Sequence, residues 1–256
     1  MLDYQYPEVI ASTYILLYVI MKEVKRMQIS EFIQWLRTQK NPEKIEGMEK
    51  YMRSQFKFLG LQANERRQLA RPFLNEQVRI AKEKAKEDIK QSTVDWDMLF
   101  TLWEQPEREF QLIGIDYLKR VQKFFILEDF KNLRKLVEWK SWWDTIDFLA
   151  KNIGHLALIE PDLEMEMISW SQEESIWIRR IAILHQLAFK EKTNTDLLSR
   201  IILNNLHDNE FFIQKAIGWS LREYAKTDKN WVKSFVTYYQ DELSSLSIRE
   251  ATKNLK

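Results

Sequence analysis

Three amphipathic segments recur in the second half of the chain about 35 residues apart, and this repeat constrains the fold more than any other feature. Each segment places large apolar residues at the spacing of one face of an α-helix. The three stripes are Trp142/Ile146/Leu149/Ile153, Trp177/Ile181/Leu184/Ala188 and Ile213/Ile217/Leu221/Tyr224. Helical pairs that repeat at this period stack on their neighbours and bury one continuous core. The repeat therefore predicts a helical solenoid.

The composition of the whole chain favours the same fold. Its 256 residues include only five glycines and five prolines, whereas helix-forming residues are plentiful. No segment shows the alternating pattern of a half-buried strand, and no Asn-Gly or Asp-Gly hairpin signal occurs. We predict an all-α protein whose stacked helical pairs present a concave surface.

Helix signals also run through the first hundred residues. Prolines, a glycine and capping residues mark where these helices are expected to begin and end. We expect helices over residues 29–39 and 43–56, a turn at Phe58-Leu59-Gly60, an N-cap at Asn64, a break or restart at Pro72, and a charged helix or linker over residues 76–90.

Residues 1–27 look unlike the rest of the chain. Their apolar segment, residues 9–21, is shorter than the ~20 residues that span a bilayer, and the acids Asp3 and Glu8 before it are unlike a signal peptide. We therefore expect no membrane partner. These residues form either an extra amphipathic helix docked on the body or a stretch that precedes a natural start at Met27. We divide the chain into an N-terminal extension, residues 1–27, and a single domain, residues 28–256.

The chain lacks the residues that several kinds of functional site require. The chain has no cysteine, which excludes disulfides, thiolate metal sites and a cysteine nucleophile; it also fits the reducing cytoplasm, the location we predict. His155, His185 and His207 lie far apart without HExxH spacing, and no glycine-rich phosphate loop occurs. We expect neither a metal nor a cofactor.

Within the first repeat, a tryptophan and a carboxylate share a helix face that the core does not occupy. At ~100° per residue, Lys140, Trp143, Asp147 and Lys151 form a stripe more than a right angle away from the apolar one. This face could hold a functional site. The alternative is a tryptophan at the edge of the core beside an ordinary solvated acid.

The third repeat carries a comparable stripe, made of Lys215, Trp219, Arg222 and Lys226, opposite its apolar residues. Because the net charge of the chain is only +1, a nucleic-acid surface requires cations gathered on one face. A tryptophan among cations fits a surface that meets phosphates and sugars. A protein-binding hot spot would have a similar composition.

The second repeat contributes two adjacent arginines. Arg179 points away from the apolar stripe, whereas Arg180 lies at its flank among apolar helical neighbours. An arginine held against apolar side chains needs an anionic partner, and Asp147 on the preceding repeat is the natural candidate. A functional site and a structural ion pair would explain this pairing equally well.

Long motifs, in order along the chain from about Asn41 to the C-terminus, carry a resemblance to a known family. They include Phe58-Leu59-Gly60, Glu65-Arg66-Arg67, Pro106-Glu107-Arg108-Glu109-Phe110, Lys140-Ser141-Trp142-Trp143-Asp144, Leu221-Arg222-Glu223-Tyr224-Ala225-Lys226 and Arg249-Glu250-Ala251. The chain resembles the HEAT-like-repeat DNA alkylation-repair glycosylases of the AlkD type. It departs from them at Asn64, where the family usually has proline, and in residues 1–27, which have no counterpart.

The resemblance implies an enzyme that excises cationic N3- and N7-alkylated purines from double-stranded DNA. It implies that Asp147 is the catalytic carboxylate, that Trp143 and Trp219 cradle the sugar of the damaged nucleotide, and that Arg180 is the essential arginine near the acid. The family is understood to leave the damaged base stacked, unlike most glycosylases.

Five residues are expected to bind DNA. The resemblance matches Tyr51 to a tyrosine that faces DNA and Arg222 to an arginine that contacts the backbone. The helix of the second repeat adds Arg179, and the cationic stripe of the third adds Lys215 and Lys226.

The chemistry of the substrate fits this assignment. A purine alkylated at N3 or N7 is a cationic leaving group, so its release needs no general acid. A carboxylate can stabilise the oxocarbenium-like sugar and orient a water, and aromatic faces attract the cationic nucleotide. A nearby arginine lowers the pKa of the carboxyl group, so Arg180 is expected to keep Asp147 ionised.

We therefore predict a monomeric DNA glycosylase of base-excision repair that acts on duplex DNA without an obligate protein partner. Two alternatives stay open: a DNA-binding repeat protein without catalysis, and a protein-binding solenoid with a contiguous apolar groove.

Overall fold

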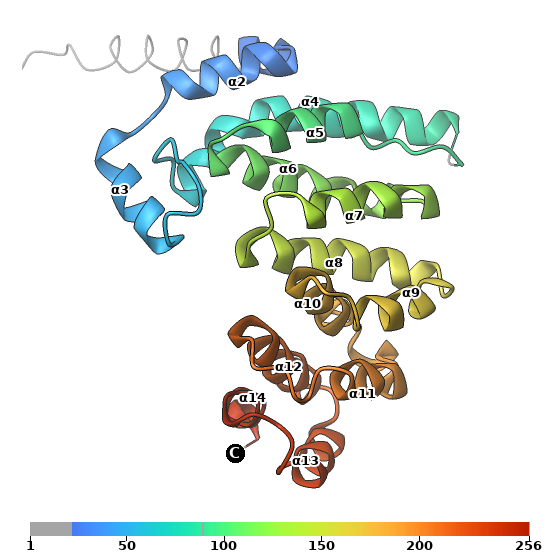
Figure 1. The fold of residues 1–256 in the computed structure, drawn as a ribbon. Helices are drawn as coiled ribbons and strands as arrows, with labels where there is room; N and C mark the ends of the chain where they lie inside the picture. The colour runs from blue at the N-terminus through green and yellow to red at the C-terminus, as the bar shows by residue number, and fades with distance from the viewer. Residues whose placement is uncertain (1–21, 89, 256) are drawn as a thin grey trace, which may run out of the picture. The chain divides into compact units, whose positions relative to one another are not determined.

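The computed structural model describes residues 22–88 and 90–255, and in this part of the chain the fold is all-α (Figure 1). The sole β-type pairing among these residues is an isolated bridge between Lys57 and Glu107. The predicted fold class is confirmed. The chain divides into two compact units, Met1–Phe124 and Phe125–Lys256. The single domain over residues 28–256 remains a prediction.

The first unit contains helices that pack around α6. Helices α4 and α5 both contact α6, and α2 contacts α5. A stacked pair of rings, Phe32 and Phe73, joins α2 to α4 with centroids 4.2 Å apart. The elements are α2 (Ile29–Thr38), α3 (Pro42–Tyr51), α4 (Ala63–Glu87), α5 (Trp96–Glu104), α6 (Arg108–Val121) and the 3-10 turn η1 (Gln122–Phe124).

Two expected helix boundaries in this unit are wrong. Helix α3 ends at Tyr51 instead of residue 56, because Arg53 and Ser54 have φ angles of 54° and 57°, which a right-handed helix does not allow. Helix α4 begins at Ala63 with Gln62 as its N-cap, so Asn64 lies inside the first turn and is not the capping residue.

Helix α4 also runs through Pro72 without a break. A proline inside a helix removes one backbone hydrogen bond and usually breaks or kinks it. Here Pro72, Phe73 and Leu74 are all buried, and this burial of apolar surface offsets the lost bond. The charged segment that follows belongs to the same helix as far as Glu87.

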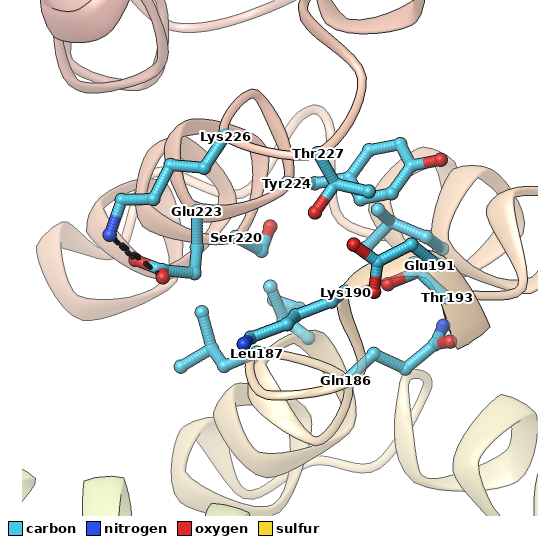
Figure 2. A pocket seen from close by; sticks show the side chains of 12 residues that line it. Gln186, Leu187, Lys190, Glu191, Thr193, Ser220, Glu223, Tyr224, Lys226 and Thr227 are labelled. Carbon is cyan, nitrogen blue, oxygen red and sulfur yellow. Dashed lines mark hydrogen bonds and ion pairs between the residues drawn. The ribbon is translucent and has the colours of Figure 1, made fainter.

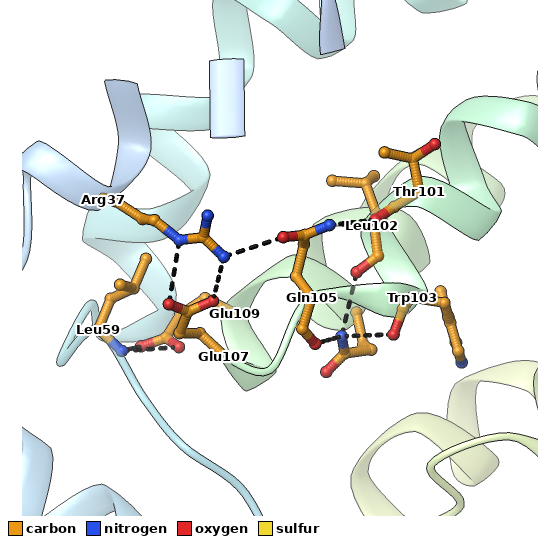
Figure 3. A network of polar contacts seen from close by, with 9 residues as sticks. Arg37, Leu59, Thr101, Leu102, Trp103, Gln105, Glu107 and Glu109 are labelled. Carbon is orange, nitrogen blue, oxygen red and sulfur yellow. Dashed lines mark hydrogen bonds and ion pairs between the residues drawn. The ribbon is translucent and has the colours of Figure 1, made fainter. Parts of the chain in front are cut away.

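The predicted turn at residues 58–60 is present and is fixed by a buried carboxylate (Figure 3). Glu109 of α6 accepts hydrogen bonds from the backbone N–H groups of Leu59, Gly60 and Leu61 at 3.0–3.1 Å. Gly60 has a φ of 85°, and a Cβ there would lie 2.0 Å from the carbonyl oxygen of Asn41. The loop after α3 is therefore tied to α6 by Glu109, and its close approach to Asn41 is one that only glycine permits.

A short helical stretch before Met27 packs on the first unit. Residues 22–26 are helical, Val24 is buried, and Lys25 forms an ion pair of 3.3 Å with Glu76 of α4. Residues 1–21 lie outside the described part of the chain. The proposed start at Met27 therefore stays a prediction.

The second unit is built from stacked helical pairs. Helices α8, α10, α12 and α14 contact one another in succession, α9 contacts α10 and α11, and α13 contacts α12 and α14. The elements are η2 (Leu127–Asp129), α7 (Phe130–Glu138), α8 (Trp143–Ile159), α9 (Leu163–Trp170), α10 (Ile176–Leu184), η3 (Lys190–Lys192), α11 (Thr195–Leu203), α12 (Phe211–Tyr224), α13 (Lys229–Tyr238), α14 (Ser245–Ala251) and η4 (Thr252–Asn254).

Eight of the twelve residues in the three predicted stripes are buried in the core of this unit. The fully buried members are Ile146, Leu149, Ile153, Ile181, Leu184, Ile213, Ile217 and Leu221. Trp142, Trp177 and Tyr224 are half-buried. Ala188 was wrongly assigned to the core: α10 ends at Leu184, so Ala188 leaves the helical register and is exposed. Among the described residues, no helix is both long and apolar enough to cross a bilayer.

Candidate active site

An ion pair joins two consecutive repeats of the second unit. Arg180 of α10 donates from Nε to Oδ1 of Asp147 at 2.8 Å and from Nη2 to Oδ2 at 3.0 Å. Its Nη1 donates to the carbonyl oxygen of Phe212, in the first turn of α12, at 2.5 Å. One guanidinium group thus joins α8, α10 and α12. The pairing of Asp147 with Arg180 that the sequence indicated is present.

An aromatic cluster supports this arginine. The ring centroids of Trp142 and Trp177 are 5.5 Å apart, and Phe212 lies 5.5 Å from Trp142 and 5.0 Å from Trp177. These residues stand at the N-terminal ends of α8, α10 and α12, with Trp142 as the N-cap of α8. The Arg180 guanidinium lies 5.9 Å from the Phe212 ring centroid. Its orientation is therefore fixed by ring packing as well as by hydrogen bonds.

The two partners of the ion pair differ in exposure. The side chain of Arg180 is 4% exposed, whereas that of Asp147 is 19% exposed. Each carboxylate oxygen accepts one bond from Arg180 and has a second lone pair. Asp147 can therefore contact a ligand or a water while Arg180 holds it.

Burial raises the pKa of Asp147, while the hydrogen bonds and the charge of Arg180 oppose that rise. The charge of Asp144 also raises the pKa of Asp147, and that of Lys151 lowers it. The effect of Arg180 thus has the sign expected from the sequence, but desolvation outweighs it.

The two candidate tryptophans occupy the same layer of helices. Trp143 is the first residue of α8, one turn before Asp147, and is half-buried. Trp219 is also half-buried and lies on α12, two turns after Phe212. Of the four predicted catalytic residues, Asp147 and Arg180 are in direct contact. Trp143 and Trp219 come from the helices on either side of α10.

The five predicted DNA-binding residues have different surroundings. Tyr51, in the first unit, is 71% exposed at the end of α3. Arg179 forms an ion pair of 2.6 Å with Asp208 and donates to the carbonyl oxygens of Glu173 and Glu174. These contacts give Arg179 a structural role.

The predicted cationic stripe of α12 is partly neutralised by acids. Lys215 and Arg222 both pair with Glu250 of α14. Lys226 pairs with Glu223 at 2.7 Å, and both line a cavity of about 240 Å³ with Lys190, Glu191 and Tyr224 (Figure 2). None of the four predicted catalytic residues lines that cavity.

The sequence argument did not assign a role to Phe212 or Glu250. Phe212 takes part through its carbonyl oxygen, which no side-chain pattern reveals. Glu250 lies in one of the motifs that carry the resemblance, and it is 35 residues from Lys215, about one repeat. That spacing is the signal that would have identified it.

Comparisons with known proteins identify the family and the fold. The model of the family described as DNA alkylation repair enzyme matches residues 32–255. Among solved structures, one described as a predicted DNA alkylation repair enzyme from Enterococcus faecalis is 36% identical with a TM-score of 0.72, covering 84% of this chain and 96% of that one. The structure of smu.31 from Streptococcus mutans shares the fold. It is 18% identical with a TM-score of 0.53, covering 75% of this chain and 98% of that one. No curated protein matches the sequence. Because the family model spans nearly the whole chain, the protein belongs to the DNA alkylation repair enzyme family, as its motifs indicated.

Proposed function

We propose that this protein is a DNA glycosylase that hydrolyses the N-glycosidic bond of cationic N3- or N7-alkylated purines in duplex DNA. The observation that carries the proposal is Asp147, a carboxylate oriented by a buried arginine and still partly open to solvent. Membership of a DNA alkylation repair family supplies the substrate class.

In the proposed reaction, the bond between C1′ and the purine nitrogen breaks first. Its electron pair leaves with the base and neutralises the positive charge that alkylation created. The sugar develops an oxocarbenium-like cation, which the Asp147 carboxylate stabilises. A water held by Asp147 then attacks C1′, and its proton passes to the carboxylate or to solvent.

The neighbouring residues have distinct parts in this proposal. Arg180 fixes the carboxylate and favours its ionised form. Trp143 and Trp219 pack against the sugar of the damaged nucleotide and attract its positive charge, worth about 0.5–2 kcal/mol for each ring. Because the base is already a good leaving group, no metal or general acid is needed.

The test is incubation with a duplex that contains one N7-methylguanine, followed by cleavage and counting of abasic sites. We expect base release at full rate in EDTA, and release that depends on Asp147. Binding to DNA without release would favour a noncatalytic DNA-binding protein. No affinity for DNA at low salt would favour a protein-binding scaffold.

A further inference from the structure

A buried carboxylate on α14 is surrounded by three cations. Oε1 of Glu250 accepts hydrogen bonds of 2.7 Å from Lys215 of α12 and from Lys253 of η4, and its Oε2 accepts one from Arg222 of α12. The side chain of Glu250 is 3% exposed, whereas all three cations are partly exposed. The cations therefore lie between the buried acid and the solvent. We call these four residues the Glu250 cluster.

A glycine allows Glu250 to reach this position. A Cβ on Gly218 of α12 would lie 2.4 Å from the Cβ of Glu250 and 2.7 Å from the carbonyl oxygen of Ser247. The Ser247 hydroxyl donates to the carbonyl oxygen of Gln214 at 2.9 Å, which also joins α14 to α12. Gly218 therefore permits the close approach of α12 and α14, which brings Glu250 beneath two cations of α12.

The cluster keeps an excess of positive charge. Burial raises the pKa of Glu250, but the hydrogen bonds and charges of Lys215, Lys253 and Arg222 lower it more strongly, to about 2. Glu250 is therefore ionised at neutral pH, and three cations around one anion leave a net charge of +2. Lysine has three N–H donors and arginine five, so one bond from each cation to Glu250 leaves donors for an external anion.

The neighbouring pair of Glu223, on α12, and Lys226, in the turn after α12, gives a contrast. Lys226 is bound one-to-one by Glu223, and this exposed pair has no net charge. Exposed ion pairs of this kind contribute little to the stability of the fold. The excess charge of this part of α12 is in the Glu250 cluster.

We propose that Lys215, Arg222 and Lys253 together form one binding site for a DNA backbone phosphate, and that Glu250 is the positioning residue that holds them in place. The proposal rests on duplex DNA being the partner in the proposed function. Lys253 is a phosphate contact that the sequence analysis did not name. Glu250 orients the three cations and does not compete with the phosphate for them. Holding three flexible side chains before binding reduces the cost of ordering them on DNA.

The first test measures binding of the full chain to an undamaged duplex over a range of salt concentrations. Lys253→Gln removes one cation from a partly exposed side chain, so it leaves the core intact. We expect weaker binding and a salt slope reduced by about one unit. Lys233→Gln, on the exposed side of α13, removes the same charge outside the cluster and is the matched control. Equal effects of the two variants would overturn the phosphate site.

The second test concerns Glu250. The variant Glu250→Gln has one more net positive charge, so charge alone predicts tighter binding. The positioning role predicts the opposite, a loss of about two- to tenfold for each side chain that must now be ordered on binding. In the double variant, Lys253→Gln should also weaken binding less than it does in the wild type. Tighter binding by Glu250→Gln, or strictly additive effects, would overturn the positioning role.

Both tests are independent of catalysis because they use undamaged DNA. A protein that binds as expected but releases no base would leave the Glu250 cluster intact and refute the glycosylase proposal. Base release with no effect of Lys253→Gln on the salt slope would support the glycosylase proposal and refute the phosphate site at the Glu250 cluster.

Discussion

Replacing Asp147 with asparagine tests the proposed chemistry most directly. The change preserves the shape of the side chain but removes the charge that faces the developing sugar cation. Loss of one preorganised electrostatic group typically lowers a rate by about 10²–10³-fold. We expect at least this reduction in single-turnover release of N7-methylguanine. Binding to undamaged duplex should survive, because a carboxylate repels phosphates.

The structure also predicts a cost in stability for Asp147→Asn. The amide offers one acceptor where the carboxylate offered two, and its NH2 group would face the N–H groups of Arg180. Removing one partner of a buried ion pair costs about 3–5 kcal/mol. The lower end, about 3 kcal/mol, applies because Asp147 is 19% exposed. The assay must therefore be run well below the melting temperature of the variant, with enzyme in excess over DNA.

A second ion pair in the same unit provides the control. Asp208 is bound by Arg179 at 2.6 Å, and both side chains are largely buried. Asp208→Asn should therefore lower the free energy of unfolding by a comparable amount without lowering the rate of base release. If both variants lost activity in proportion to their loss of stability, Asp147 would have a structural role only. Normal single-turnover release by folded Asp147→Asn would refute the proposed chemistry.

Four further predictions follow from particular contacts. Because burial raises the pKa of Asp147, the rate of base release should fall on acidification with a midpoint above the ordinary aspartate pKa of 3.8. Arg180→Gln removes an opposing cation and should shift this acidic limb of the pH–rate profile to higher pH. Trp219→Ala should weaken binding to damaged duplex and slow release, each by about 0.5–2 kcal/mol, in titration and single-turnover assays. Glu109→Gln should lower the free energy of urea unfolding by about 1–3 kcal/mol, because an NH2 group then faces backbone N–H groups. A chain beginning at Met27 should fold and release base, with a loss of up to about 3 kcal/mol in urea unfolding from the missing Val24 side chain.

Part of the core of the second unit was predictable because helical periodicity is local. Ile146, Ile181 and Ile217 each lie on an apolar stripe that can be found within four turns of sequence, and all three are buried. Helix ends were less predictable. Arg53 and Ser54 adopt positive φ angles without being glycine or asparagine, so the residues that end α3 have no strong local signal.

The charged residues show a different limit of local reasoning. Lys215 and Arg222 were correctly placed on one face of α12, but the face alone does not say whether a cation is paired. Their partner Glu250 arrives from α14 because Gly218 permits close contact. That information is held in tertiary packing, since it joins residues about 30 positions apart. Counting cations along a single helix therefore overstates the positive charge available to a ligand.

The repeat itself supplies a way to recover such partners. Stacked repeats place equivalent positions of neighbouring helices side by side, so polar partners tend to be one period apart. The pairs Asp147–Arg180, Arg179–Asp208 and Lys215–Glu250 are separated by 33, 29 and 35 residues. Hydrogen bonds from Asn204 to Ser171 and from Ser247 to Gln214 each span 33 residues. From the sequence, Arg180 was paired with an acid on the preceding repeat. The same search, for an opposite charge one period from each cation, would also have found the partner of Lys215. The same period that builds the core of the second unit therefore also sets several of the polar pairs between its neighbouring helices.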